Sequence, residues 1–236
     1  MPTNAKPTAL VTGVSSGIGR AIAESLLQEG WQVHGLDIAL GQFDSADYTH
    51  WRVDLTDSMA LSQVLDDILG RVTPMALVHA AGVLRVGALG DLQQADGALM
   101  WRLHVDAAVQ LANRVLPAMH RRQQGKMVMV GSRVSRGMAG RSQYAASKAA
   151  LVSLARSWAA ESASQGVTVN VVSPAATDTP MLKDPARANT MPRLPPLGRL
   201  IRADEVASLV LYLLGPQAAG ITGQDIAICG GSSVQA

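Results

Sequence analysis

The segment Thr12-Gly13-Val14-Ser15-Ser16-Gly17-Ile18-Gly19 is a glycine-rich turn that follows a short apolar run and precedes an amphipathic segment. A turn of this kind, between a strand and a helix, aims backbone N–H groups and a helix N-terminus at a phosphate group. Side chains would hinder that approach, which accounts for the three glycines, while the two serines offer hydroxyl donors. The pattern predicts a dinucleotide site made by Gly13, Ser15, Ser16, Gly17, Ile18 and Gly19.

Short apolar runs and longer helical patterns alternate along the rest of the chain. Strand-like runs cover Thr8–Val11, Gln32–Leu36, Trp51–Val53, Met75–His79, Lys126–Val130, Val167–Val172 and Asp225–Cys229. Helical patterns cover Ile18–Gln28, Asp57–Leu69, Asp96–Arg121, Ser142–Ala163 and Ala203–Leu213. This alternation predicts an α/β fold, a doubly wound parallel sheet of the Rossmann type with helices on both faces. No repeat or linker interrupts it, so we expect residues 1–236 to form a single domain.

The bulk composition excludes several classes of function. Hydrophobic residues make up 48% of the chain and the formal net charge is +2, without a long basic block, so we expect no nucleic-acid partner. The single cysteine, Cys229, allows no internal disulfide and no cysteine-rich metal site, and we predict no metal. The lack of a signal peptide and of a long apolar segment predicts a cytoplasmic protein with no membrane partner.

Two aspartates follow predicted strands at positions where a dinucleotide would lie. At Asp37 a carboxylate can accept hydrogen bonds from the adenosine ribose hydroxyls and repel a 2′-phosphate. Ile38 and Ala39 carry no positive charge, so we predict NAD over NADP; the alternative is that Asp37 only caps a turn. Asp54, with Leu55 beside it, could face the adenine amino group or form the N-cap of the next helix.

The segment from Pro174 to Arg202 breaks the alternation, with six prolines and no steady period. A long irregular segment inside a compact domain is commonly functional or disordered. It also follows the end of a parallel strand, where open α/β sheets bind ligands. We predict that residues of about 175–202 form a mobile flap over the substrate; the alternative is a surface loop without a role.

A second motif carries acid/base chemistry: Tyr144-Ala145-Ala146-Ser147-Lys148, with Ser132 twelve residues before Tyr144. Tyr144 and Lys148 are four residues apart in a predicted helix, so their side chains share one face. A phenol has an ordinary pKa of about 10, and a nearby ammonium lowers it. Tyr144 could then take a proton from an alcohol or give one to a ketone. Ser132 could hold the same substrate oxygen, and Lys148 could also bind the nicotinamide ribose.

These motifs together resemble the short-chain dehydrogenase/reductase family over nearly the whole chain. The glycine turn matches the family's nucleotide turn, and Ser132, Tyr144 and Lys148 match its catalytic positions. His79-Ala80-Ala81-Gly82 stands where the family shows Asn-Asn-Ala-Gly, and residues 170–174 with 177–179 match the segment that grips the nicotinamide carboxamide. The resemblance implies a homotetramer and further cofactor contacts from Ala80, Ala81, Gly82, Pro174, Ala175, Thr177 and Thr179.

Two positions depart from the family pattern. The long helix normally carries an asparagine that helps to relay protons through water to the lysine, and His104 stands in its place. Histidine can donate, accept and change charge near neutral pH. We therefore predict that His104 is a fourth catalytic residue, in the relay; the alternative is a weakened catalyst. Ala175 replaces a glycine, a small change that we expect to be tolerated.

Some stretches, residues 80–88, 221–226 and 230–232, are most similar to 2,3-dihydro-2,3-dihydroxybenzoate dehydrogenases. This resemblance implies NAD-dependent oxidation of a cyclic dihydrodiol carboxylate, a siderophore precursor. Its carboxylate could pair with one of Arg85, Arg133, Arg136 and Arg141. One alternative small-molecule substrate is a 3-oxoacyl thioester or another ketone, reduced usually with NADPH. A more remote alternative is a non-catalytic protein that binds the dinucleotide without turnover.

Overall fold

The computed structural model describes residues 6–41, 43–183 and 194–234. Within these residues a parallel sheet of seven strands has the order β3-β2-β1-β4-β5-β6-β7. The strands are β1 (Thr8–Thr12), β2 (Gln32–Asp37), β3 (Tyr48–Arg52), β4 (Ala76–His79), β5 (Gly125–Val130), β6 (Val167–Pro174) and β7 (Asp225–Ile228). The order reverses between β1 and β4, which leaves a crevice at their carboxyl ends. The predicted doubly wound α/β fold is confirmed.

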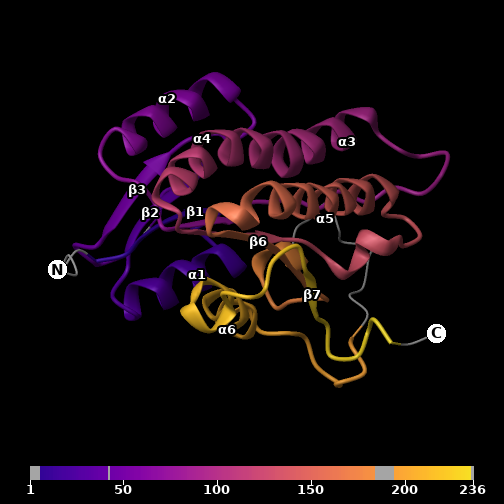
Figure 1. Ribbon diagram of the computed structural model, residues 1–236. Helices are drawn as coiled ribbons and strands as arrows, with labels where there is room; N and C mark the ends of the chain where they lie inside the picture. The colour runs from indigo at the N-terminus through magenta and orange to yellow at the C-terminus, as the bar shows by residue number, and fades with distance from the viewer. Residues whose placement is uncertain (1–5, 42, 184–193, 235–236) are drawn as a thin grey trace.

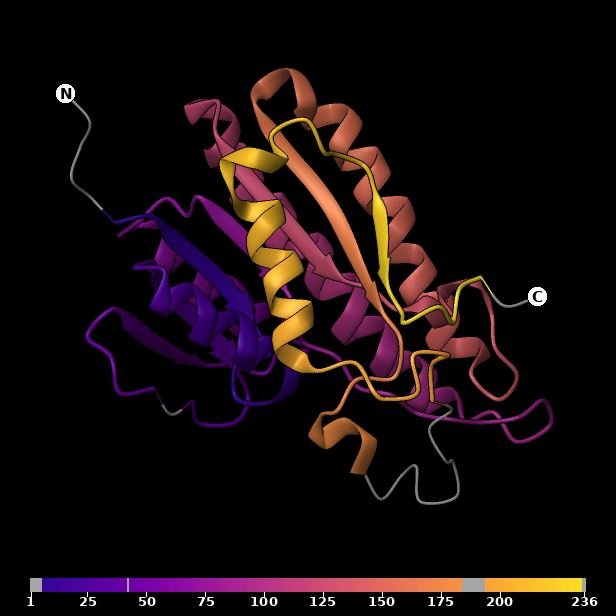
Figure 2. The same ribbon diagram turned by 90° about the horizontal axis from the view of Figure 1, so that it is seen from below.

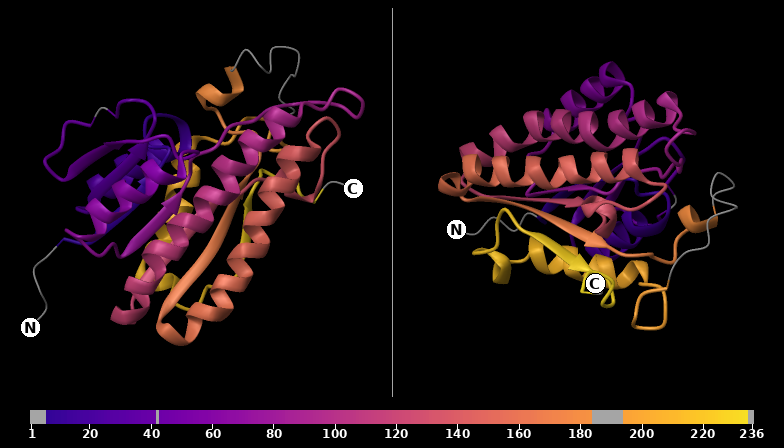
Figure 3. Two further views of the ribbon diagram at one scale, coloured as in Figure 1. Left: turned by 90° about the horizontal axis from the view of Figure 1, so that it is seen from above. Right: turned by 90° about the vertical axis from the view of Figure 1, so that its right-hand side faces the viewer.

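Helices cover both faces of the sheet (Figure 1). One face carries α1 (Gly17–Gln28) and α6 (Ala203–Leu214), which lie in front of the strands in Figure 2. The other face carries α2 (Ser58–Leu69), α4 (Ala107–Arg122) and α5 (Ser142–Ser162), with α3 (Gln94–Trp101) continuing the line of α4. The three layers are seen edge-on in the right panel of Figure 3. None of the helices in the described residues is long and apolar enough to cross a membrane.

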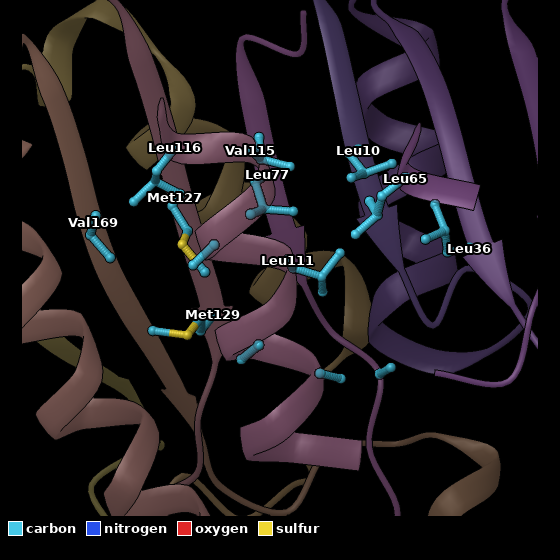
Figure 4. Packing of buried hydrophobic residues seen from close by; sticks show 14 of the residues in the cluster. Leu10, Leu36, Leu65, Leu77, Leu111, Val115, Leu116, Met127, Met129 and Val169 are labelled. Carbon is cyan, nitrogen blue, oxygen red and sulfur yellow. The ribbon is translucent and has the colours of Figure 1, made fainter. Parts of the chain in front are cut away.

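The strands are apolar because helices bury them on both faces. All five residues of β1 and all eight of β6 are buried. Under α2, α4 and α5 lies a cluster that includes Leu10, Leu65, Leu77, Leu111 and Met127 (Figure 4). A second cluster packs under α1 and α6 and includes Ile22, Leu26, Val78, Val210 and Leu213. This aliphatic packing fixes the carboxyl ends of the central strands relative to one another.

Two elements differ from the sequence prediction. Strand β3 spans Tyr48–Arg52 and not Trp51–Val53, because this edge strand is partly exposed and its polar residues hide the apolar pattern. The helix predicted over Asp96–Arg121 begins at Gln94, and a π-helical segment, η1 (Arg102–Asp106), interrupts it. Such insertions are frequent at functional sites, and His104 lies in this one.

The described parts of the proline-rich segment, residues 174–183 and 194–202, lie at the carboxyl ends of the strands (Figure 2). The first part forms a short 3-10 helix, η4 (Pro180–Lys183), and an isolated bridge joins Thr177 to Ile201 on the second part. Figure 2 shows η4 beyond the ends of the central strands. Residues 184–193 of the predicted flap lie outside the described residues.

Candidate active site

A cavity of about 720 Å³ lies at the carboxyl ends of the central strands, a volume suited to a small-molecule or cofactor site. Most of the residues predicted from the sequence line it, while Ser15 and His104 do not. The predicted residues on its wall are Gly13, Ser16, Gly17, Ile18, Gly19, Asp37, Asp54, Leu55, Ala80, Ala81, Gly82, Ser132, Tyr144, Lys148, Pro174, Ala175, Thr177 and Thr179. The fold thus brings the two sequence motifs to one cavity.

The glycine turn packs tightly against the chain that follows β4. Gly13 has a φ of +74°, and a Cβ there would lie 2.8 Å from the Cα of Ala81. A Cβ on Gly19 would lie 2.1 Å from the carbonyl oxygen of Gly13. Close backbone packing therefore requires glycine at both positions. It leaves the N-terminus of α1 open to the cavity, as an anion site needs.

The two serines of the turn occupy different environments. Ser16 lines the cavity as the N-cap residue of α1, and its side chain makes no capping hydrogen bond. The Ser15 hydroxyl instead donates to the carbonyl of Ala39 at 3.1 Å. Ser16 is therefore better placed than Ser15 to offer a hydroxyl to a ligand.

Asp37 lies at the end of β2, where its carboxylate organises the neighbouring backbone. Its Oδ2 accepts from the Ser15 N–H at 3.0 Å, and its Oδ1 accepts from the Ala39 N–H at 2.9 Å. A carboxylate has about four acceptor positions on its two oxygens. Asp37 can therefore hold this turn and still offer acceptors to the cavity that it lines.

Asp54 lines the cavity but does not cap a helix. Its Oδ1 accepts from the N–H and from the hydroxyl of Thr56, both at 2.8 Å. The N-cap of α2 is Asp57, whose carboxylate accepts from two N–H groups of the first turn. The alternative prediction that Asp54 forms the N-cap is therefore wrong, because the helix starts three residues further on.

Helix α5 brings Tyr144 and Lys148 to the cavity wall. Tyr144 is 8% exposed and Lys148 4% exposed, and the Lys148 ammonium lies 5.9 Å from the centroid of the Tyr144 ring. A positive charge at this separation favours the phenolate form. Ser132 reaches the same cavity from the end of β5, and its oxygen accepts from the Val134 N–H at 3.2 Å. That bond uses the oxygen of Ser132 and not its proton.

Lys148 is held by the strand next to its helix. Its ammonium donates to the carbonyl of Val130, at the end of β5, at 2.8 Å. Burial lowers the pKa of Lys148 to about 7, because an interior of low dielectric disfavours the charged form. An amine that changes charge near neutral pH beside a phenol suits a proton-transfer site.

His104 is fully buried behind the cavity wall. Its Nδ1 lies 2.9 Å from the Ser147 hydroxyl oxygen, and its Nε2 lies 3.0 Å from the Val83 nitrogen. A Cβ on Gly82 would lie 3.1 Å from His104 Nε2 and 3.5 Å from Lys148 Nζ. His104 is thus in contact with α5, and both of its ring nitrogens already have protein partners.

The loop after β6 forms another wall of the cavity. The Thr177 hydroxyl donates to the carbonyl of Ala175 at 3.0 Å, and the Thr179 hydroxyl donates to that of Thr177 at 3.3 Å. A Cβ on Gly17 would lie 3.2 Å from the methyl carbon of Thr179. The loop therefore contacts the glycine turn, and Met181 and Leu182 add apolar lining beyond it.

Two of the four candidate arginines line the cavity, Arg133 and Arg141. Arg85 lies beside Asp96, with 3.8 Å between Nε and Oδ1. Arg136 is exposed and lies outside the lining. An anionic group of a substrate would therefore meet Arg133 or Arg141.

Two residues near the site, Ser147 and Arg52, were not predicted from the sequence. Ser147 stands inside the Tyr-Lys motif, but its contact with His104 depends on the packing of η1 against α5. Arg52 pairs in register with Asp37 across β2 and β3, and its Nε donates to the carbonyl of Ile38 at 3.1 Å. This places a cation near Asp37, and the sequence does not reveal it because the register between β2 and β3 cannot be known from the sequence.

A doubly wound sheet with a glycine turn, serine, tyrosine and lysine on one cavity defines an oxidoreductase class, and comparison with known proteins agrees. Residues 13–233 match the family model "Enoyl-(Acyl carrier protein) reductase". The chain is 35% identical over 234 residues to the 3-oxoacyl-[acyl-carrier-protein] reductase FabG of Escherichia coli (strain K12), with 94% of this chain and 96% of the relative covered. It is also 35% identical over 240 residues to the 2,3-dihydro-2,3-dihydroxybenzoate dehydrogenase of that strain, with 96% of each covered.

A solved structure gives the same result. The aldohexose dehydrogenase of Thermoplasma acidophilum has a TM-score of 0.89 at 28% identity, with 98% of this chain and 95% of that one covered. The chain belongs to the short-chain dehydrogenase/reductase family and is an oxidoreductase acting on CH–OH donors. Among the described residues, no group of three or more His, Cys, Asp or Glu side chains could hold a metal ion.

Proposed function

We propose that this protein transfers hydride between NAD and the carbon of a small cyclic secondary alcohol, with Tyr144 as the acid/base. One observation carries the proposal: Tyr144, Lys148 and Ser132 share a cavity with the glycine turn and Asp37. Ser132, Tyr144 and Lys148 can move a proton at an oxygen atom of the substrate. The glycine turn and Asp37 can hold a dinucleotide beside that substrate.

The residues that line the cavity fit a nicotinamide dinucleotide. The N-terminus of α1 is open to the pyrophosphate because glycine packing keeps side chains away. Asp37 would hold the adenosine ribose, and Asp54 and Leu55 would lie at the adenine. Lys148 would hold the nicotinamide ribose, and the nicotinamide would supply or accept the hydride. The remaining contacts would come from Ala80, Ala81, Gly82, Pro174, Ala175, Thr177 and Thr179.

The chain's own residues perform the proton transfer. The Ser132 hydroxyl donates a hydrogen bond to the substrate oxygen and orients it. Tyr144 removes the alcohol proton as the carbonyl forms, and it returns that proton when the reaction runs toward the alcohol. Lys148 stabilises the phenolate through its charge, 5.9 Å from the ring centroid.

The two cavity-lining arginines and the 35% identity to a dihydroxybenzoate dehydrogenase support a cyclic dihydrodiol carboxylate as the substrate. Reduction of a 3-oxoacyl thioester is a second candidate. The equal identity to a 3-oxoacyl-carrier-protein reductase supports it, and so does Arg52 beside Asp37, which could receive a 2′-phosphate.

We also propose a homotetramer, because α3 and α4 leave Trp101 and Val109 exposed.

The test is the rate of NADH formation from NAD with 2,3-dihydro-2,3-dihydroxybenzoate, simple cyclic alcohols and a 3-hydroxyacyl thioester, with NADP in parallel. Turnover of the dihydrodiol acid with NAD supports the proposal. Turnover of the thioester with NADP supports the second candidate. Dinucleotide binding without turnover on any alcohol would overturn the acid/base role of Tyr144.

A further inference from the structure

Two buried histidines take no part in the proton transfer described above. His79 ends β4 and His104 lies in η1, and both are 0% exposed. His79 Nε2 lies 3.2 Å from the backbone carbonyl oxygen of His104. The two residues therefore form one connection between the sheet and the helical layer behind the cavity.

The partners of His79 fix the position of its ring proton. The Thr12 hydroxyl oxygen accepts from the N–H groups of Ala80 and Ala81, both at 3.1 Å. Its own proton is then directed at His79 Nδ1, 3.0 Å away. Because Nδ1 accepts, the ring proton lies on Nε2, from which it is donated to the carbonyl of His104.

The partners of His104 fix the opposite tautomer. Its Nε2 accepts from the Val83 N–H, so its proton lies on Nδ1 and is donated to the Ser147 hydroxyl oxygen. The Ser147 proton goes on to the carbonyl of Tyr144 at 2.8 Å. Each donor in this chain of bonds has an acceptor, and each acceptor nitrogen has used its single lone pair.

The surroundings favour the neutral form of both rings. Burial and the nearby Lys148 charge lower the pKa of His79 to about 3, and they hold the pKa of His104 well below its ordinary value. A second proton on His104 would also face the Val83 N–H. Both rings therefore stay in the tautomers that the hydrogen bonds require.

We propose that His79 and His104 are a coupled pair of positioning residues, which holds the backbone of Tyr144 in register with the turn that starts at Thr12. The pair acts through Ser147 on one side and through Thr12 on the other, and His104 carries no proton to Lys148. The expected effect of this pair on turnover rests on the proposed function. The expected tautomers of the two rings do not depend on it.

Substitution by an amide side chain tests the contacts of the two ring nitrogens of His104 one at a time. At position 104, asparagine places its amide where Nδ1 lies and keeps the Ser147 bond, and glutamine reaches toward Val83 and loses Ser147. We expect His104→Gln and Ser147→Ala each to lower kcat about tenfold, whereas His104→Asn, which keeps the Ser147 bond, should keep kcat within about threefold of the wild type. The dissociation constant of NAD should stay within about twofold. Adding Ser147→Ala to His104→Gln should cost little more, because one bond is lost only once.

A matched control lies on the same helix layer. The Nε2 atom of His120 on α4 lies 2.9 Å from the Ser162 hydroxyl oxygen of α5, outside the cavity. His120→Asn removes the same kind of contact, because the shorter amide does not reach the position of Nε2, and it should leave kcat unchanged. An equal loss in His120→Asn would mean that any histidine–serine contact between these helices matters, and it would overturn the positioning role of this pair.

The deciding experiment is nitrogen-15 NMR of histidine-labelled protein without substrate, with signals assigned by His79→Gln and His104→Gln. We expect His79 protonated at Nε2 and His104 at Nδ1, both neutral from pH about 8 to about 5.5. A charged ring or the opposite tautomer would overturn the proposal whatever the substrate is.

Discussion

The carboxylate of Asp37 accepts a hydrogen bond from the backbone N–H of Ser15 at 3.0 Å and so ties the end of β2 to the glycine turn. The group that would select the ribose is thereby fixed to the segment that would bind the pyrophosphate. A change at Asp37 should therefore alter cofactor choice more than chemistry.

Asp37→Asn removes the negative charge and keeps one acceptor oxygen. We expect the ratio of kcat/KM for NAD to kcat/KM for NADP to fall by about tenfold or more, because repulsion of the 2′-phosphate is lost. Steady-state kinetics with both cofactors measures it, with Asp44→Asn, an exposed carboxylate outside the cavity lining, as the control. An unchanged ratio would remove Asp37 from cofactor selection.

Lys148→Met keeps a long apolar side chain and removes the ammonium beside Tyr144. We expect kcat to fall by about 10²–10⁴-fold, the usual contribution of an acid/base group, because the phenolate loses its charge partner. Lys126→Met is the control, since Lys126 is a partly buried lysine on β5 that does not line the cavity. Comparable losses in both variants would point to a general effect of lysine removal.

Arg133→Gln tests how a carboxylate on the substrate is recognised. We expect kcat/KM for a dihydrodiol carboxylate to fall by about tenfold or more, because a charge-assisted pair is lost. An uncharged cyclic alcohol should be little affected. Arg136→Gln, three residues along and outside the cavity, should change neither rate. If Arg133→Gln slows both substrates equally, its role is not carboxylate binding.

Acid should destabilise the protein through its buried histidines. Burial lowers the pKa of His79 to about 3, while an unfolded histidine binds a proton below about pH 6.5. Between these values the unfolded chain binds more protons, so stability is present above pH 6.5 and falls as the pH drops toward 3. The expected slope is about 1.4 kcal/mol per pH unit for each such histidine.

Denaturant unfolding of the wild type and His79→Gln at a series of pH values measures this slope. The glutamine retains a donor for the carbonyl of His104 but cannot titrate. We expect the stability difference between the two proteins to shrink as the pH falls below 6.5. A difference that is constant with pH would show that His79 is protonated in the folded state.

The sequence was sufficient for the fold because its signals are local. The glycine turn, the alternation of apolar runs and helical patterns, and the four-residue spacing of Tyr144 and Lys148 each depend on neighbours in the chain. The bounds of strand β3 were wrong because an edge strand has a weak apolar pattern. The π-helical segment around His104 could not be predicted, because its five residues lie inside a continuous helical pattern and carry no sequence signal of their own.

The hydrogen bonds within the site could not be predicted from the sequence, because they depend on contacts between distant segments. Nothing in the sequence joins His79 to His104 or directs Lys148 to the carbonyl of Val130, since backbone acceptors carry no side-chain signal. The relay at His104 was proposed from its place in the long helix, whereas the contacts of its two ring nitrogens with Ser147 and Val83 depend on packing. The positions of the motifs in the sequence predicted which residues line the cavity. The packing of the elements determines which hydrogen bonds these residues form.

The role of Tyr144 as the acid/base is decided by Tyr144→Phe, which removes one oxygen and keeps the ring. We measure NADH formation at saturating NAD and substrate, and NAD affinity by fluorescence titration. The account predicts a fall in kcat of about 10³-fold or more, with the dissociation constant of NAD within about twofold of the wild type. A folded Tyr144→Phe protein that keeps more than about a tenth of kcat would contradict the acid/base role of Tyr144.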